Sequence, residues 1–231
     1  YAAIFSDITK LKENEERVRR LAYYDALTDL PNRRLFEDRL EVALAQAHRY
    51  DHVLALLYVD LDRFKRINDT LGHEVGDHLL QRVTESMSGV LREGDTLARV
   101  GGDEFVILLP ELEETLDAVR VARRLVEILG EPFHVDDHEL FVTSSVGISF
   151  YPMDGTDGEM LLHHADNAMY RAKEVGRNNY QLYTAEMNAR SFQSLNMEAQ
   201  LRHALGRGEM ACHYQPVVDA GTGATVGAEA L

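Results

Sequence analysis

Two glycines and two acids, Gly101-Gly102-Asp103-Glu104, are the residues best suited to carry chemistry. They separate two apolar runs, 97–100 and 105–109, a pattern that predicts a β-hairpin with a four-residue loop. Glycines let the backbone adopt positive φ and let a ligand approach the main chain closely. Clustered carboxylates repel one another unless a cation neutralises them. The loop therefore indicates a cation site, although a solvent-exposed acidic turn would have the same composition.

A second pair of acids, Asp60 and Asp62, follows the near-continuous apolar run from Val53 to Val59. Such a run predicts a strand that is buried on both faces and ends at Asp60. Carboxylates at the end of a buried strand, beside an acidic hairpin tip, indicate a site for a hard cation such as Mg²⁺. Magnesium retains waters and usually shares a substrate phosphate, so the pattern points to phosphate chemistry.

The residues after this strand offer groups that could bind a nucleotide. Lys65 can meet phosphate oxygens as a point charge. The amide of Asn68 and the carboxylate of Asp77 can together read the donor and acceptor edge of a guanine. Each also has a structural alternative: an Asx turn at Asn68, and a helix N-cap at Asp77 ahead of the apolar positions 79–90.

These groups must be positioned by a sheet with helices packed on it. Apolar residues recur at helical spacing over 36–47, 79–90, 119–129 and 161–172, the last closed by Gly176. Beyond the strands at 53–59, 97–100 and 105–109, we expect a strand over 140–150 with one apolar face and a short one over 180–183. This order predicts an α+β fold with a central, mostly antiparallel sheet.

Composition limits the classes of function. The 231 residues carry a formal net charge of −15, which argues against a protein that binds nucleic acid through a broad basic face. It leaves room for one nucleotide, which needs only a few local cations. Cys212 is the only cysteine, so no intrachain disulfide forms, and we expect a reducing, cytoplasmic setting. No apolar run reaches transmembrane length, although a longer parent protein could carry a membrane anchor.

Four motifs in order resemble one family. The segment V-D-L-D-R-F-K-R-I-N-D-T-L-G-H-E-V-G-D at 59–77 and V-G-G-D-E-F at 100–105 are similar to the GGDEF family of diguanylate cyclase domains. D-A-L-T-D-L-P-N-R-R at 25–34 and A-K-E-V-G-R-N at 172–178 resemble its opening and closing signatures. The likeness covers about residues 23–183. Asp29 departs from it, since the family more often has glycine there.

The resemblance implies a nucleotidyl-cyclase-like palm fold and condensation of two GTP into cyclic di-GMP and pyrophosphate. Mg²⁺, with Mn²⁺ as an alternative, would be held by Asp60, the Leu61 carbonyl and Asp103, and Glu104 would support the loop. Asp103, Glu104 and Lys65 would be the catalytic residues. Guanine would be read by Asn68 and Asp77. The triphosphate would be held by Lys65, Lys173 and Arg177, with backbone amides near Phe64 and at Gly102.

Arg92 and Asp95 form an R-x-x-D pattern five residues before the hairpin loop. Taken alone it predicts a polar turn after a helix, with Gly94 as the C-cap. In the family that the chain resembles, this pattern is the inhibitory site for the product. An arginine can fork onto guanine O6 and N7, and an aspartate can accept from ring N–H groups. A third cation is expected from Arg123, with Arg120 and Arg124 as alternatives.

The flanks extend the resemblance and predict five segments. Residues 1–9 look like the end of a PAS sensor domain, 10–24 a linker or signalling helix, 25–184 the GGDEF domain, 185–208 a second linker helix, and 209–231 the beginning of an EAL phosphodiesterase domain in which Glu229 would be a metal ligand. Turnover would need a homodimer, because each domain would hold one GTP. The alternative function is a module that binds GTP or cyclic di-GMP and regulates an attached phosphodiesterase.

Overall fold

The computed structural model describes residues 17–18, 20–187, 197, 202, 204, 206–209 and 211–230. It divides into two units, Tyr1–Asn188 and Ala189–Leu231, which we describe separately. The predicted end of a PAS domain at 1–9 and most of the predicted helices at 10–24 and 185–208 lie outside the described residues. In the described part of the chain, no helix combines the length and the apolar character needed to cross a membrane.

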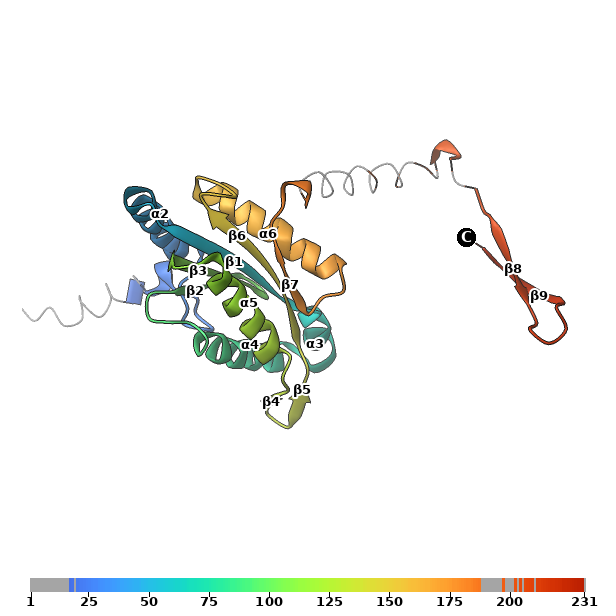
Figure 1. Cartoon of the computed structure of the whole chain (residues 1–231). Helices are drawn as coiled ribbons and strands as arrows, with labels where there is room; N and C mark the ends of the chain where they lie inside the picture. Colours follow the sequence, from blue (N-terminus) through green and yellow to red (C-terminus); the bar gives the residue numbers. More distant parts are fainter. Residues whose placement is uncertain are drawn as a thin grey trace, which may run out of the picture. The chain divides into compact units, whose positions relative to one another are not determined.

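The first unit is built on one mixed sheet of five strands (Figure 1). The strands follow the order β2-β3-β1-β6-β7; only the β6–β7 pair is parallel, so the predicted α+β, mostly antiparallel architecture is confirmed. The elements are α2 (Arg33–Tyr50), β1 (Val53–Asp62), α3 (Phe64–Leu71), α4 (His73–Ser88), β2 (Thr96–Gly101), β3 (Glu104–Leu112), α5 (Thr115–Leu129), β4 (Phe133–Val135), β5 (His138–Leu140), β6 (Thr143–Tyr151), α6 (Gly158–Glu174) and β7 (Asn179–Leu182).

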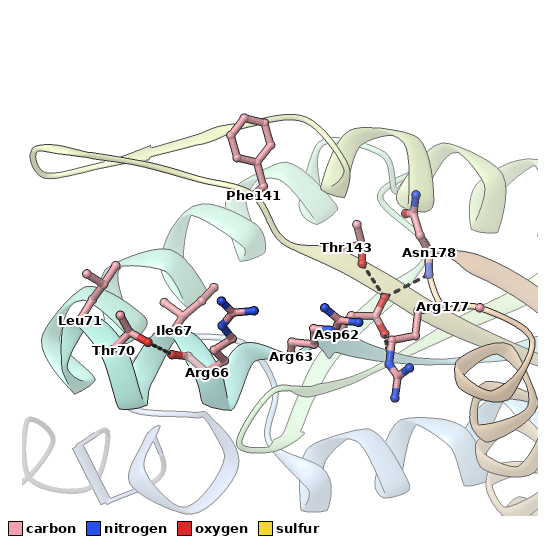
Figure 2. Close-up of a pocket in the computed structure, with 11 residues that line it drawn as sticks. Asp62, Arg63, Arg66, Ile67, Thr70, Leu71, Phe141, Thr143, Arg177 and Asn178 are labelled. Carbon is pink, nitrogen blue, oxygen red and sulfur yellow. Dashed lines mark hydrogen bonds and ion pairs between the residues drawn. The ribbon is translucent and has the colours of Figure 1, made fainter. Parts of the chain in front are cut away.

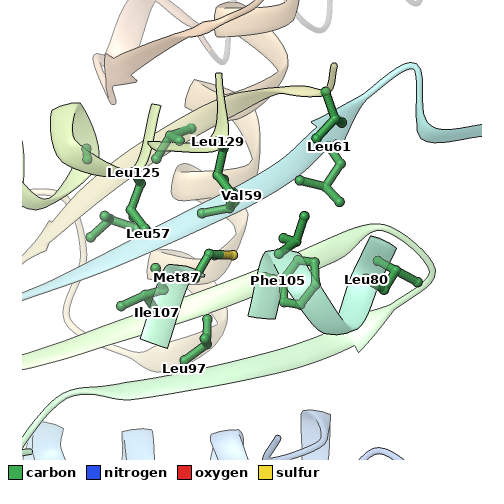
Figure 3. Packing of buried hydrophobic residues seen from close by; sticks show 14 of the residues in the cluster. Leu57, Val59, Leu61, Leu80, Met87, Leu97, Phe105, Ile107, Leu125 and Leu129 are labelled. Carbon is green, nitrogen blue, oxygen red and sulfur yellow. The ribbon is translucent and has the colours of Figure 1, made fainter. Parts of the chain in front are cut away.

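Strand β1 is the centre of the sheet and is buried on both faces, as the apolar run predicts. Its alternate residues belong to two different cores. Leu57, Val59 and Leu61 face α4 and α5, whereas Leu54 and Leu56 face α2 and α6 (Figure 3 shows the first core). The sheet is therefore the middle layer of the unit, with α4 and α5 packed on one face and α2 and α6 on the other. Strand β1 is held by side-chain packing on both of its faces.

Helix α6 packs unusually close to the sheet at Gly147 of β6. A Cβ added there would lie 2.0 Å from the carbonyl oxygen of Ala165 and 2.1 Å from the amide nitrogen of Met169. Both atoms belong to the α6 backbone, which cannot yield as a flexible side chain would. Glycine is thus required at this position for α6 to hold its C-terminal residues beside β1.

Three predicted details are wrong. The hairpin loop is a two-residue turn at Gly102 and Asp103, because β2 and β3 extend to Gly101 and Glu104. The predicted strand over 140–150 is divided: its beginning belongs to the small hairpin of β4 and β5. Finally, Gly89 and not Gly94 caps the helix before the R-x-x-D pattern.

The second unit contains one described hairpin, β8 (Tyr214–Val218) paired with β9 (Thr225–Ala230). The two strands lie on either side of the turn that contains Gly221-Thr222-Gly223. Every described residue of both strands is exposed, so within the described part of this unit the hairpin buries no core of its own. A two-stranded hairpin of this kind is at best marginally stable alone.

Candidate functional site

The acidic hairpin tip lies directly against the end of β1. Asp60 pairs with Glu104 across the β1–β3 ladder, and the Leu61 amide donates a hydrogen bond of 3.2 Å to the carbonyl of Asp103. Gly102 has φ of +47°, a left-handed conformation that favours glycine and lets the chain reverse within two residues. The structure therefore brings together Asp60, Leu61, Asp103 and Glu104, which the sequence analysis assigned to one cation site.

Lys173 places a cation in this acidic group. Its Nζ lies 2.7 Å from Oδ2 of Asp60, near the C-terminal end of α6. Burial raises the pKa of Asp60 to about 6, against the lowering effect of the Lys173 ammonium, and Asp103 and Glu104 raise it further. Lys173 was predicted as a triphosphate ligand, and its position beside Asp60 puts it next to the carboxylates as well.

The donor set of this group fits a hard divalent ion. Carboxylate and carbonyl oxygens are the ligands that Mg²⁺ prefers, and Mg²⁺ usually keeps several waters. Among the residues that the structure describes, no three His, Cys, Asp or Glu side chains converge closely enough to hold a metal unaided. Asp60, Asp103 and the Leu61 carbonyl would thus hold the ion only together with water or substrate phosphate.

Asp62, the second acid after the buried run, is held by hydrogen bonds within the fold. Its two carboxylate oxygens accept hydrogen bonds from Thr143 Oγ1 at 2.6 Å, Ser145 Oγ at 2.7 Å and the Asn178 amide at 3.1 Å. Figure 2 shows the bonds from Thr143 and Asn178. Asp62 thereby fastens the end of β1 to β6 and to the loop between α6 and β7, where Arg177 lies 4.0 Å from it.

Two residues that the sequence analysis missed support the hairpin tip. The Arg99 guanidinium donates hydrogen bonds of 2.9 and 2.8 Å to the Gly102 carbonyl and pairs with Asp25 at 2.9 Å. Asp25 in turn accepts from the amide and hydroxyl of Thr28. The D-A-L-T segment at 25–28 is therefore a brace for the turn, and the arginine directly before Val100 was the signal that could have revealed it.

Tyr58 is the second missed residue. Its hydroxyl donates a 3.2 Å hydrogen bond to Oε2 of Glu104 from the neighbouring strand. Burial raises the pKa of Tyr58 above its usual value, and Glu104 raises it further, so the phenol stays protonated and remains a donor. The bond holds the Glu104 carboxylate on the face of the sheet that carries Asp60.

The predicted guanine-reading residues lie on two helices joined at Gly72. Asn68 is inside α3 and Asp77 is inside α4, so neither the Asx turn nor the N-cap describes them. Oδ1 of Asn68 is buried and has no hydrogen-bond partner. A Cβ at Gly76 would lie 1.8 Å from that oxygen, so the glycine makes room for the amide. A buried acceptor without a donor is costly, and a ligand N–H would satisfy it.

The remaining predicted binding residues flank this position. Phe64 is buried at the first turn of α3, and Lys65 beside it is exposed. Asp77 is exposed on α4, and Arg177 is exposed in the loop after α6. Of the positive groups, Lys65 thus lies on α3, Lys173 lies near the end of α6, and Arg177 lies in the loop between α6 and β7.

The R-x-x-D residues are bonded to each other in this structure. Arg92 Nε lies 3.0 Å from Oδ1 of Asp95, and Arg92 also donates to the carbonyl of Glu111. The Asp95 side chain is only 3% exposed. Arg123, the predicted third cation, forms a hydrogen bond with Tyr180 of β7 that raises its pKa. Among the described residues, Arg123 is thus bonded to β7, whereas Arg92 is bonded to Asp95 and to β3.

The first unit thus combines a mixed sheet, a buried carboxylate at the end of the central strand and a glycine–acid hairpin beside it. Residues 22–179 match the family described as "Diguanylate cyclase, GGDEF domain". The chain therefore belongs to the GGDEF diguanylate cyclase domain family.

The curated relatives of this chain are longer proteins, and the chain matches only part of each. The chain is 44% identical over 223 residues to the bifunctional diguanylate cyclase/cyclic di-GMP phosphodiesterase MucR of Pseudomonas aeruginosa, covering 96% of this chain and 32% of MucR. It spans about a third of the length of the curated relatives that it matches first.

Two solved structures share the fold. The GGDEF domain of TpbB from Pseudomonas aeruginosa is 41% identical with a TM-score of 0.72, covering 74% of this chain and 99% of that one. The coiled coil and GGDEF domain of DgcB from Caulobacter crescentus, in complex with c-di-GMP, is 30% identical with a TM-score of 0.69, covering 76% of this chain and 93% of that one.

Proposed function

We propose that this domain condenses two molecules of GTP into cyclic di-GMP with release of two pyrophosphates. The observation that carries the proposal is the meeting of Asp60, Asp103 and Glu104 at the end of β1, with Lys173 against Asp60. Membership of the GGDEF diguanylate cyclase domain family supports it. A domain that had lost one of these acids would favour binding without catalysis.

The reaction forms one bond and breaks one bond at each α-phosphorus. The 3′-hydroxyl oxygen of one GTP bonds to the α-phosphorus of the other, the bond to the bridging β-phosphate oxygen breaks, and the hydroxyl proton is released. Mg²⁺ would supply charge neutralisation for the attacking and leaving oxygens. Asp60 and Asp103 would position the phosphates through that ion, Glu104 would support the turn, and Lys65, Lys173 and Arg177 would hold the triphosphate.

One domain would hold one GTP, so turnover would need two copies with their hairpin tips facing each other. The proposed partner is therefore a second copy of the chain. The initial rate per chain should increase with protein concentration, because only paired domains bring a 3′-hydroxyl to the opposite α-phosphorus.

Asn68→Ala should weaken the binding of GTP by about ten-fold and leave the weaker binding of ATP unchanged. The reason is that the buried Oδ1 is assigned to the N–H edge of guanine, which adenine lacks. Equilibrium titration of both nucleotides with the wild type and the variant checks this. Asp69→Asn, an exposed neighbour on α3, is the matched control. Equal losses for GTP and ATP would contradict the guanine assignment.

Arg92→Ala should weaken product inhibition and leave the initial rate unchanged. In the proposed product site Arg92 would exchange its bonds with Asp95 and Glu111 for a fork on guanine, a contact worth about 1–3 kcal/mol, or about ten- to hundred-fold in affinity. Progress curves with and without added cyclic di-GMP should then stay linear for longer in the variant. If cyclic di-GMP inhibits both proteins equally, Arg92 and Asp95 form only a polar turn.

The whole protein is proposed to combine this domain with others. MucR is described as bifunctional, and in this chain residues 209–231 are proposed to begin a phosphodiesterase domain, with a PAS domain before residue 10. The second unit offers Glu229 as one metal ligand and has no core in its described part, so no phosphodiesterase activity is assigned to it alone.

A further inference from the structure

A cavity of about 490 Å³ lies beside the candidate cyclase site, between α3, the segment before β6 and the loop between α6 and β7 (Figure 2). Its volume is within the range of small-molecule sites. Along α3 it is lined by Arg66, Ile67, Thr70 and Leu71, and not by Lys65 or Asn68. The cavity and the proposed guanine site therefore use different residues of the same helix.

The cavity is cationic although the chain as a whole is acidic. Among the described residues, the guanidinium groups of Arg63 and Arg66 make no hydrogen bond or ion pair. Arg177 also lines the cavity, but it lies 4.0 Å from Asp62 and is assigned to the GTP triphosphate, so the second site relies on Arg63 and Arg66. Unpaired arginines around a concave surface favour an anion, and the guanidinium fork matches phosphate.

The lining also includes three apolar side chains. Phe141 lies at the rim, 69% exposed, and Ile67 and Leu71 of α3 also face the cavity. An exposed aromatic ring beside arginines can stack on the face of any base, whatever the identity of that base. The two hydroxyls in the lining are both engaged: Thr143 donates to Asp62, and Thr70 donates to the carbonyl of Arg66. The protons of these hydroxyls are thus already used and are not free to donate to a base.

We propose that this cavity is a second nucleotide site, which binds a nucleoside polyphosphate with its phosphates on Arg63 and Arg66 and its base against Phe141. The site does not select the base, in contrast to the guanine site around Asn68. It does not depend on the proposed cyclase activity, because Arg63, Arg66 and Phe141 have no part in that mechanism.

The test is titration calorimetry of the chain with ATP in the presence of EDTA, which removes metal-dependent binding at the acidic group. ATP should bind, and GTP should bind equally well to the Asn68→Ala variant. Arg66→Ala should reduce the affinity for ATP by about ten-fold, because it removes a charge-assisted contact. Phe141→Ala should reduce it by about five-fold, since base stacking is lost. Asn68→Ala and the distant control Arg49→Ala should leave it unchanged.

Two further probes separate phosphate recognition from base recognition. Inorganic pyrophosphate should bind more weakly than ATP and lose affinity in Arg66→Ala but not in Phe141→Ala, and adenosine should not bind. The proposal is overturned if ATP does not bind at millimolar concentration, if neither variant weakens it, or if pyrophosphate binds as tightly as ATP. Both substituted residues are exposed, and unchanged thermal unfolding of the two variants is the check that any loss is local.

Discussion

Asp103→Asn is expected to reduce the synthesis of cyclic di-GMP by at least about 100-fold while the fold stays intact. Asp103 lies in the two-residue turn at the tip of the β2–β3 hairpin, and its carboxylate is proposed to hold Mg²⁺. Asparagine keeps the size of the side chain and removes its charge, so a metal-bound phosphate loses its neutralising ligand. Losses of this size follow the removal of one group that stabilises transition-state charge.

The control for this variant is Asp137→Asn, an exposed aspartate in the turn between β4 and β5. Both variants should unfold at the same temperature as the wild type, because the backbone carbonyl of Asp103, not its side chain, bonds to Leu61. A titration of the rate with Mg²⁺ should show that Asp103→Asn needs more metal than Asp137→Asn. Near wild-type turnover by Asp103→Asn would refute the metal assignment.

Arg99→Ala is expected to have the second-largest effect on the rate of synthesis. Arg99 would act only by holding the Gly102–Asp103 turn in position, without touching GTP or Mg²⁺. Arg99 joins the Gly102 carbonyl to Asp25, and its side chain is only 12% exposed. Without it the turn is free to shift, and the Asp25 carboxylate, whose hydrogen bonds with Thr28 and Arg99 hold its pKa below the usual value despite burial, loses its cation. A misplacement of about 1 Å can cost roughly 100-fold in rate.

The free energy of unfolding of Arg99→Ala should also fall by about 2 kcal/mol, because the substitution removes one partner of a partly buried ion pair and leaves the Asp25 carboxylate without its cation. Arg99→Lys separates the two roles: lysine restores the charge beside Asp25 but not the paired N–H groups on Gly102. Its stability should recover more than its rate. Initial rates and urea unfolding of the two variants, with Arg49→Ala as control, give this comparison. Equal recovery of rate and stability in Arg99→Lys would show that the two hydrogen bonds from Arg99 to the Gly102 carbonyl have no positioning role.

The parts of the fold that the sequence predicts are those with strong local patterns. The apolar run at 53–59 identifies the central strand, and the apolar spacing after Asn32 identifies α2. Helix α3 was not predicted as a separate element, because its eight residues bury only Phe64. The hairpin of β4 and β5 was missed for a similar reason: three-residue strands carry too little periodicity, and their pairing depends on tertiary contacts.

The site could be predicted as a list of residues but not as a set of contacts. The motifs indicate that Asp60 and Asp103 act together, and the β1–β3 pairing brings them to one place. The role of Asp62 could not be predicted, because its partners on β6 and after α6 are distant along the chain. The same holds for Arg99 and Tyr58, whose hydrogen bonds depend on strand register and on a turn that is tighter than expected.

The most direct test of the account is to incubate the chain with GTP and Mg²⁺, with Asp103→Asn in parallel, and to separate the nucleotides. The wild type should convert GTP into cyclic di-GMP and pyrophosphate in the ratio of one to two, at a rate per chain that rises with protein concentration, and Asp103→Asn should not. GTP that stays bound to the wild type without forming either product would contradict the cyclase and favour a regulatory nucleotide-binding module.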